Sequence, residues 1–245
     1  MSTNIDTTGR RGFLGRIFGA AAAASLPMAE VASAQTKAPA AHPASGPDSW
    51  IAEVKGTHRT LFDFPRHANG WPLVHIFNYL NTYHEAYKLT PGQSVGAVGT
   101  FYSMGTASSI PLAFNDTIWE KYAIGDYLGI KDGAGKPFTY NAYNRLTPEN
   151  AGFIFTGNQL PAIPEMAPLA AALNISNLQK MGTKFLLCNN ALGGWILELA
   201  ARGKGKADEI EKDLRANILP GVTLVPAMVI AIEKAQAAGI RYNRQ

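Results

Sequence analysis

An alternation of short apolar strands and amphipathic helices in the C-terminal half constrains the fold of this chain more than any other feature. Residues 183–188 (TKFLLC) form one strand-like run. A helix face follows, with apolar residues at the i, i+3, i+4, i+7 spacing: Leu192, Trp195, Ile196 and Leu199. Residues 222–225 form a second strand, after which Pro226 opens a helix that Gly239 ends. The alternation predicts an α/β fold with an open parallel sheet, right-handed crossovers and helices on both faces.

The preceding residues extend the same pattern. Residues 73–80 (LVHIFNYL) are mostly apolar on both faces, as a buried parallel strand is, and residues 94–102 (SVGAVGTFY) form another strand candidate. Helices are expected at 82–89, at 109–129 with Asp116 as a cap, at 168–181 with Pro168 at its start and Gly182 as its stop, and at 207–217.

Composition divides the chain into a leader, a tether and one α/β domain. Residues 35–70 begin rich in Ala, Pro and Ser and lack periodicity, which predicts a flexible tether and an N-terminal extension. Residues 71–245 form the predicted domain, because no internal repeat of roughly 20 to 50 residues divides them. Within this domain the Gly-, Pro-, Asn- and Tyr-rich residues 131–164 indicate an insertion, in which 153–155 are expected as a short strand.

Residues 1–34 have the three parts of an export signal. Arg10 and Arg11 precede Gly-Phe-Leu, an alanine-rich run follows, and Ala32 and Ala34 supply the small residues of a signal-peptidase site. In this order the parts resemble a twin-arginine (Tat) signal peptide cleaved near Ala34; an uncleaved N-terminal anchor is the alternative. The resemblance implies export of the folded protein to the bacterial periplasm, with the Tat translocase as a partner during export. The mature part has no segment long and apolar enough to span a bilayer.

Composition also argues against several classes of function. The net charge is +4 and no stripe rich in Lys and Arg is present, which argues against nucleic acid as a partner. A single cysteine excludes an internal disulfide and a multi-cysteine zinc site. Covalent c-type haem is excluded because no Cys-x-x-Cys-His occurs, and no glycine loop of phosphate-binding spacing is present. We therefore expect neither a metal nor a cofactor.

Cys188 carries the clearest chemical signal in the sequence. It ends the strand 183–188 and directly precedes a helix, so it is expected uncovered at the carboxyl edge of the sheet, where α/β folds gather reactive groups. The positive end of the helix favours the thiolate, which is the form that acts as nucleophile and sulfur acceptor. The alternative is a buried cysteine that acts as a small hydrophobic residue.

The histidines give weaker signals. His75 and His84 flank the first predicted strand and its helix, and we take His84 as a substrate-binding candidate that could orient or protonate a substrate at the edge of the sheet. An ordinary hydrogen-bonded histidine is the alternative reading, because the spacing of the two residues does not match that of metal ligands. A soft copper site of His84, Met104 and Cys188 is a further alternative.

Three segments resemble the DsrE/DsrF-like family: 182–190 (GTKFLLCNN), 218–226 (ILPGVTLVP) and 236–242 (QAAGIRY). The extended branch of that family typically shows a Gly-Val-Xaa-Phe-Xaa-Val-Cys strand, a Leu-Pro-Gly-Val-Xaa-Val-Val-Pro segment and a terminal Gln-Xaa-Xaa-Gly-Xaa-Xaa-Tyr. The resemblance implies a flavodoxin-like sheet, a homo-oligomer, and a sulfurtransferase that carries persulfide sulfur on the cysteine matching Cys188.

Together these observations predict a periplasmic sulfur-relay protein. The Cys188 thiolate takes sulfur from a sulfane-sulfur donor and passes it to an acceptor protein, while the amides of Asn189 and Asn190 hold the anion. Turnover requires a partner or a small thiol, because the chain has no second cysteine. One alternative is a structural subunit of an assembly. Another is a non-catalytic module that binds a ligand or partner in a pocket lined by Phe101, Tyr102, Phe114, Trp119, Tyr122 and Tyr127.

Overall fold

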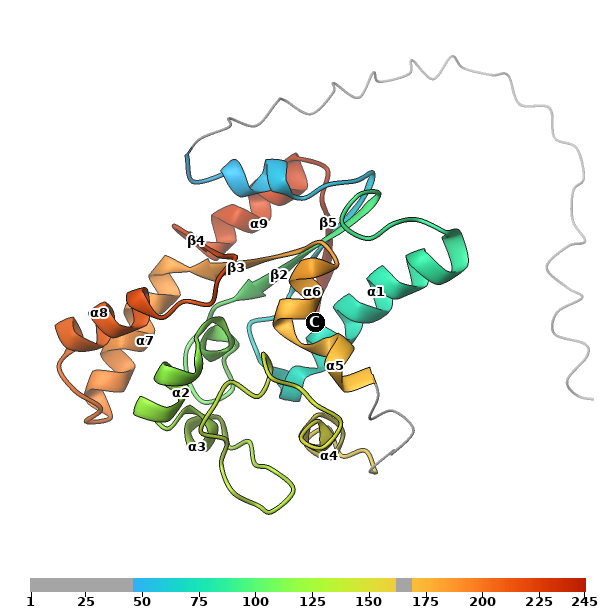
Figure 1. Cartoon of the computed structure of the whole chain (residues 1–245). Coiled ribbons are helices and arrows are strands. Elements are labelled where there is room, and N and C mark those ends of the chain that lie inside the picture. Colours follow the sequence, from blue (N-terminus) through green and yellow to red (C-terminus); the bar gives the residue numbers. More distant parts are fainter. Residues whose placement is uncertain (1–45, 162–168) are drawn as a thin grey trace, which may run out of the picture. The chain divides into compact units, whose positions relative to one another are not determined.

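The computed structural model describes residues 46–161 and 169–245, and its centre is a five-stranded, all-parallel sheet (Figure 1). The sheet has the order β4-β3-β2-β1-β5. Its strands are β1 (His58–Asp63), β2 (Val95–Phe101), β3 (Thr183–Cys188), β4 (Val222–Val225) and β5 (Arg241–Arg244). This is the open, flavodoxin-like α/β sheet that the alternation predicted. The predicted signal peptide, with Arg10 and Arg11, and the start of the tether lie outside the described residues.

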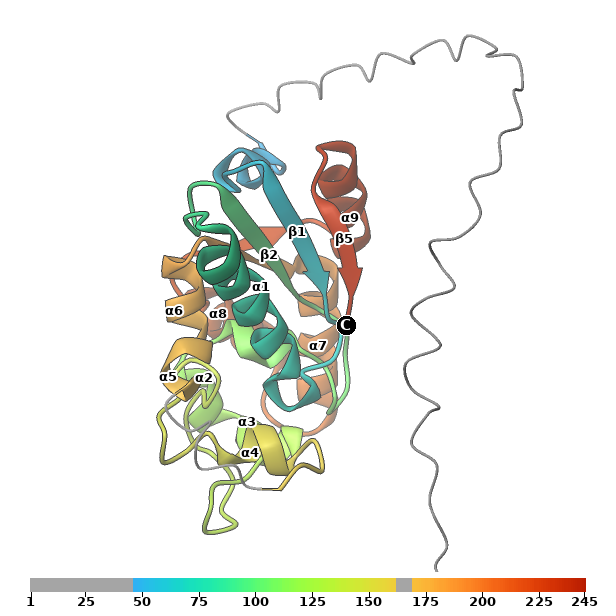
Figure 2. The same ribbon diagram turned by 90° about the vertical axis from the view of Figure 1, so that its right-hand side faces the viewer.

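The order in which the strands join the sheet determines which face each helix covers. The first four strands follow one another across the sheet, and the chain then returns to pair β5 with the other side of β1. Right-handed crossovers therefore put the last crossover helix on the opposite face from the earlier ones. The first face carries α1 (Trp71–Tyr87), α6 (Ile175–Lys180) and α7 (Asn189–Ala201), with α8 (Ala207–Ala216) beside α7. The other face carries α9 (Met228–Ala237) and the short 3-10 helix η1 (Ser49–Glu53) (Figure 2).

Two hydrophobic clusters hold these layers together. On the α1 side, Phe101 and Phe185 are fully buried, and their rings stack with centroids 5.0 Å apart. On the α9 side, Leu61 and Leu186 are buried between the strands and the helix. Burying one side chain of this size contributes about 2 kcal/mol, so both layers are tightly held. Alternate residues of β3 face opposite clusters, and Cys188 faces the α9 side.

The predicted strand at 73–80 is wrong, because these residues form the first half of α1. The helix continues through the predicted helix 82–89 and ends at Tyr87. Its fully buried side chains are spaced i, i+3, i+7 and form one helix face: Leu73, Ile76 and Leu80. A short apolar run does not by itself distinguish a buried strand from a helix that is buried on one side.

Two strands of the sheet lie outside the sequence prediction. β1 falls within residues 35–70, which the composition assigned to a tether and extension, so these residues contribute a strand to the sheet. β5 consists of four exposed polar and aromatic residues (RYNR) that pair only with β1. The predicted strands 183–188 and 222–225 and the helices that follow them are confirmed, as is the strand at 94–102.

The predicted helical region 109–129 consists of three short helices. They are the 3-10 helix η3 (Ile110–Ala113), α2 (Asp116–Lys121) and α3 (Ile124–Leu128). Asn115, and not Asp116, caps α2, because its side chain accepts a hydrogen bond from Thr117 N at 3.1 Å. Asp116 instead accepts a hydrogen bond from Asn141 N at 2.9 Å and pairs with Arg145 at 2.7 Å.

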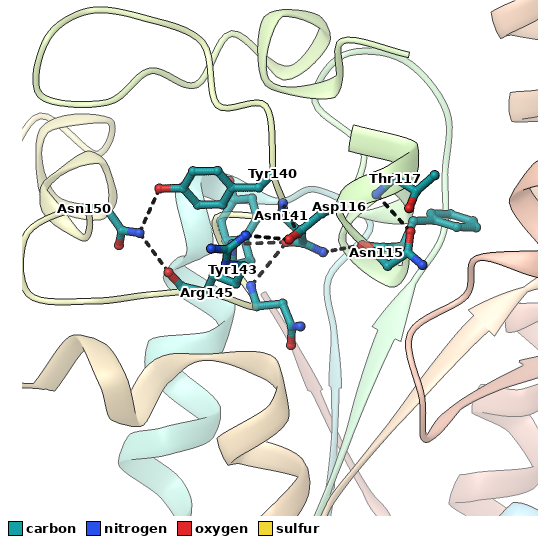
Figure 3. Close-up of polar contacts among 10 residues, drawn as sticks. Asn115, Asp116, Thr117, Tyr140, Asn141, Tyr143, Arg145 and Asn150 are labelled. Atoms are coloured by element: carbon teal, nitrogen blue, oxygen red, sulfur yellow. Dashed lines mark hydrogen bonds and ion pairs between the residues drawn. The ribbon is translucent and has the colours of Figure 1, made fainter. Parts of the chain in front are cut away.

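The described part of the insertion is held to α2 and η3 by a polar network (Figure 3). The buried Asn141 Nδ2 donates to Leu112 O at 3.0 Å and to Phe114 O at 2.7 Å. Asn150 Nδ2 donates to Tyr140 Oη at 3.1 Å and so ties the far side of the loop to the same network. The predicted strand 153–155 is wrong, because its three residues are buried within the helix α4 (Gly152–Thr156).

The predicted helix 168–181 is divided into α5 (Ala170–Leu173) and α6, and Pro168 lies outside the described residues. The break falls at Asn174, whose side chain accepts a hydrogen bond from Asn177 N at 2.8 Å and caps α6. Gly182 follows the end of α6 with a φ of +95°, a conformation that favours glycine. Among the helices within 46–161 and 169–245, none has the length and apolar character needed to cross a lipid bilayer.

Candidate functional site

The carboxyl ends of β3 and β4 form a topological switch point in the sheet. The chain leaves β3 into α7 on one face and leaves β4 toward α9 on the opposite face, so the two connections diverge. In open α/β sheets, ligands and reactive groups gather in the crevice that such a divergence leaves. Cys188 is the last residue of β3 and pairs with Val225, the last residue of β4. It therefore lies at the switch point.

Two main-chain N–H groups point at the sulfur of Cys188. Cys188 is the N-cap of α7, and its Sγ accepts a hydrogen bond from Ala191 N at 3.4 Å. Met228 N, at the first residue of α9, donates to the same Sγ at 3.3 Å. The N-terminal ends of two helices, 13 and 10 residues long, thus converge on one atom. Their partial positive charges stabilise negative charge on that sulfur.

The sulfur is less exposed than the sequence predicts. The Cys188 residue is 5% exposed and belongs to the cluster between the sheet and α9, so the prediction of an uncovered thiol is wrong. Helix α9 covers the sulfur. This helix lies over β3 because the chain crosses back over the sheet between β4 and β5. The site therefore combines the two alternatives: hydrocarbon surrounds the side chain, while main-chain donors reach its sulfur.

The two asparagines do not make the contacts predicted for them. Asn190 N donates to Pro226 O at 3.3 Å, and Asn190 itself is exposed. Asn189 Oδ1 accepts a hydrogen bond from Arg215 Nη2 of α8 at 3.0 Å. The cause is the geometry of the helix end, because an N-cap side chain accepts from an N–H group two or three residues further on. The main-chain N–H groups of Ala191 and Met228 contact the sulfur instead.

The structure does not bring His84 to Cys188. His84 is exposed in the last turn of α1, on the sheet face opposite to the one that Cys188 faces. Met104 lies in the loop after β2, in contact with Gly194 of α7. The structure therefore does not bring together the three residues of the alternative copper site, His84, Met104 and Cys188. Within the part of the chain that the structure describes, no group of three or more His, Cys, Asp or Glu residues is placed to hold a metal ion.

A polar cluster that the sequence analysis missed lies on the same sheet face as Cys188. Asp63, the last residue of β1, is 5% exposed. Its carboxylate accepts hydrogen bonds from Tyr102 Oη at 2.8 Å and from Tyr242 Oη at 2.7 Å. Tyr102 follows the β2 residue that pairs with Leu187, and it packs against the cluster that contains Cys188. The side chains thus follow one another along the carboxyl edge in the order Tyr242, Asp63, Tyr102, Cys188.

Burial and the Asp63 carboxylate both raise the pKa of the two phenols. Burial raises the pKa of Tyr102, and its hydrogen bond to Asp63 raises it further. For Tyr242 the hydrogen bond to Asp63 is the main cause of a raised pKa, and burial adds to it. Among the described residues no lysine or arginine forms an ion pair with Asp63, so its charge is satisfied by hydroxyl groups. Recognising β1 in the sequence would have revealed Asp63 at the end of a strand.

The aromatic residues in the middle of the chain build the core and do not line the predicted pocket. Five of the six are 8% exposed or less: Phe101, Phe114, Trp119, Tyr122 and Tyr127. Tyr102 alone is half-buried, and it belongs to the Asp63 cluster. The binding-module alternative therefore finds no support at these positions.

Comparison with known proteins finds no match among family models, curated protein sequences or solved structures.

Proposed function

We propose that the chain is a sulfur carrier that holds sulfane sulfur as a persulfide on Cys188. The observation that carries the proposal is the convergence of two helix N-termini on this sulfur, with N–H donors at 3.3 and 3.4 Å, at the switch point of the sheet. Oriented main-chain donors of this kind stabilise an anion without a bound cation. The persulfide is such an anion. The resemblance of residues 182–190 to the DsrE/DsrF-like cysteine strand supports the same assignment.

In the proposed loading step, the Cys188 thiolate attacks the outer sulfur of a sulfane donor such as thiosulfate. A bond forms between Sγ and that outer sulfur while the bond from the outer sulfur to the sulfonate breaks. The electron pair of the broken bond leaves with sulfite. The products are the Cys188 persulfide anion and sulfite, so atoms and charge balance without an external oxidant or reductant.

Discharge of the sulfur requires an acceptor from outside the chain, because Cys188 is its single cysteine. A thiolate of a partner protein or a small molecule attacks the outer sulfur, takes it as a new persulfide, and releases the Cys188 thiolate. The exposed fraction of 5% favours acceptors that reach the sulfur with a small or extended group. The proposal places this relay in the periplasm, after twin-arginine export, and in a homo-oligomer.

Mass spectrometry of the intact protein tests the loading step. The purified, reduced chain is incubated with thiosulfate or polysulfide, and we expect a gain of one sulfur atom that an excess of small thiol removes. Cys188→Ser should gain none. Asn190→Ala, a matched control at an exposed neighbour, should load as the unchanged chain does. Failure to gain sulfur under conditions that load an established sulfur carrier contradicts the proposal.

A further inference from the structure

A row of aromatic rings runs along the surface of α1 at intervals of four residues: Trp71, His75, Tyr79, Tyr83 and Tyr87. The interval of four keeps successive side chains on neighbouring positions of one helix face. The rings contact one another, with centroids 5.1 Å apart for Tyr79 and Tyr83 and 5.2 Å apart for Tyr83 and Tyr87. All five are half-buried or exposed, and Tyr87 is 66% exposed. The row is therefore partly exposed: His75 and Tyr87 lie at the surface, whereas Trp71, Tyr79 and Tyr83 also pack against the core on the α1 side.

The aromatic row forms one wall of a cavity of about 760 Å³. The opposite wall is the end of β5 with the residues Asn243, Arg244 and Gln245, and Phe62 of β1 lies between the walls. Figure 2 shows α1 running beside the sheet edge at which β5 ends. His75 Nδ1 and Gln245 Oε1 are hydrogen-bonded, so the two walls are joined directly. This volume is in the range of small-molecule sites.

The polar groups of the cavity are positioned by the protein itself. Gln245 N donates to Asp63 O at 2.9 Å, and Gln245 Nε2 donates to Asn243 Oδ1 at 2.9 Å. On the helix, Asn78 and Thr82 lie four residues apart and form a second row beside the rings. A row of apolar ring surfaces thus stands next to rows of amide and hydroxyl groups.

The charges of the cavity limit what it can bind. No aspartate or glutamate is among the described residues that line it; Arg244 is among them, but its pairing with Asp63 places its side chain on the α9 face of the sheet, toward Tyr102 and Tyr242. One arginine is too few for the phosphates of a nucleic acid strand. The polar β5 wall equally disfavours a buried apolar helix.

A pyranose sugar has the matching surface. Its C–H faces are apolar and pack on aromatic rings, while its hydroxyl groups at the rim bond to amide and hydroxyl groups. Successive rings are inclined to one another, by 76° for Tyr79 and Tyr83 and by 42° for Tyr83 and Tyr87, so a sugar would pack on individual rings of the row. We propose that the cavity between α1 and the end of β5 binds a short oligosaccharide, with its sugar faces on the aromatic row. This site is independent of Cys188, which faces the opposite side of the sheet.

Tryptophan fluorescence offers a direct test, because Trp71 lines the cavity whereas Trp50, Trp119 and Trp195 are fully buried. The purified chain is titrated with cellobiose, chitobiose and digalacturonate, and binding is confirmed by calorimetry. We expect a saturable change in fluorescence with at least one of them. Tyr83→Ala and Asn78→Ala should each weaken binding by about fivefold to tenfold, whereas His84→Ala on the same helix should not change it.

Several results would overturn the proposal. The absence of a saturable response to all three sugars would overturn it. A response that Tyr83→Ala leaves unchanged would overturn it as well. Binding of a proline-rich peptide in place of the sugars would assign the aromatic row to a protein partner instead. A concentration-dependent dimer that Tyr83→Ala dissociates would assign it to a second copy of the chain. None of these results affects sulfur loading at Cys188, so the two proposals fail separately.

Discussion

The Cys188 site and the cavity beside α1 lie on opposite faces of one sheet, and they are built from different parts of the chain. At Cys188 the contacts to the reactive atom come from main-chain N–H groups of two helix ends. In the α1 cavity the contacting groups are side chains, arranged by the repeat of four residues along one helix. A site defined by the main chain tolerates changes in neighbouring side chains, whereas a site defined by side chains loses binding with each one removed.

The largest expected effect is the loss of one activity in a variant that keeps the other. Cys188→Ser should abolish sulfur loading and leave sugar binding within error, because serine has no sulfur to accept and the cavity is on the other face. Tyr83→Ala should weaken sugar binding about fivefold to tenfold and leave the extent of loading unchanged. Intact-mass measurements and fluorescence titrations on both variants check this. If either variant changes both activities while keeping its native circular dichroism, the two regions are coupled and the comparison is wrong.

Acidification should destabilise the fold through His67. His67, just before α1, is 7% exposed, and burial lowers its pKa to about 4 from 6.5. Between these values the unfolded chain binds the proton and the folded chain does not, so the free energy of unfolding falls as the pH drops from about 6.5 to about 4. A shift of this size corresponds to about 3 kcal/mol at most.

Urea unfolding at pH 7 and at pH 4.5 measures this effect. In His67→Gln the pH-dependent difference should shrink, since glutamine keeps an acceptor for Asn69 N but does not titrate. The buried hydrogen bond between His67 Nδ1 and Tyr143 Oη, 2.8 Å long, is the contact that protonation opposes. An identical pH dependence in the variant would remove His67 as its cause.

The Asp63 cluster should contribute less, and its two phenols should contribute unequally. Tyr102→Phe removes a donor to a buried carboxylate, which costs about 1–3 kcal/mol. Tyr242→Phe should cost less, because Tyr242 is 41% exposed and water can replace its hydroxyl group. Urea midpoints of both variants measure the difference. Equal losses would mean that water does not reach the Tyr242 side of the cluster.

The smallest effect is expected for an asparagine beside Cys188. Asn189→Ala removes a side chain that bonds to Arg215 and not to the sulfur, so the rate of sulfur loading should stay within about twofold, under 0.5 kcal/mol. The matched change in the cavity, Asn78→Ala, should reduce sugar affinity several-fold. Stopped-flow loading and calorimetric titration compare the two. A large loss of loading in Asn189→Ala would show that side chains, and not the main chain, define the Cys188 site.

The sequence predicts those helices and strands whose apolar residues follow a spacing typical of only one kind of element. The strand 183–188 and the helix face at Leu192, Trp195 and Leu199 have such patterns and are confirmed. The run 73–80 is apolar enough for either structure, and its i, i+3, i+7 burial becomes evident only once α1 is packed. β5 is polar and exposed, so only its pairing with β1 makes it a strand.

The candidate site shows the same limit. Cys188 was identified because its position at the end of a strand and the start of a helix can be read within a few residues. The second donor, Met228 N, lies 40 residues further along the chain and approaches only because α9 covers that face. Asp63 ends β1, Tyr102 directly follows β2 and Tyr242 lies in β5, and the sequence predicted neither β1 nor β5 as a strand. Contacts between distant segments therefore required the structure.

Peptide mapping of the loaded protein tests the central claim most directly. The chain is treated with polysulfide, its persulfide is trapped with iodoacetamide, and the tryptic peptide 185–202, which contains Cys188, is analysed by mass spectrometry. The account predicts one additional sulfur atom on Cys188 in this peptide. A peptide that carries no additional sulfur, under conditions in which a control carrier is fully loaded, would contradict it.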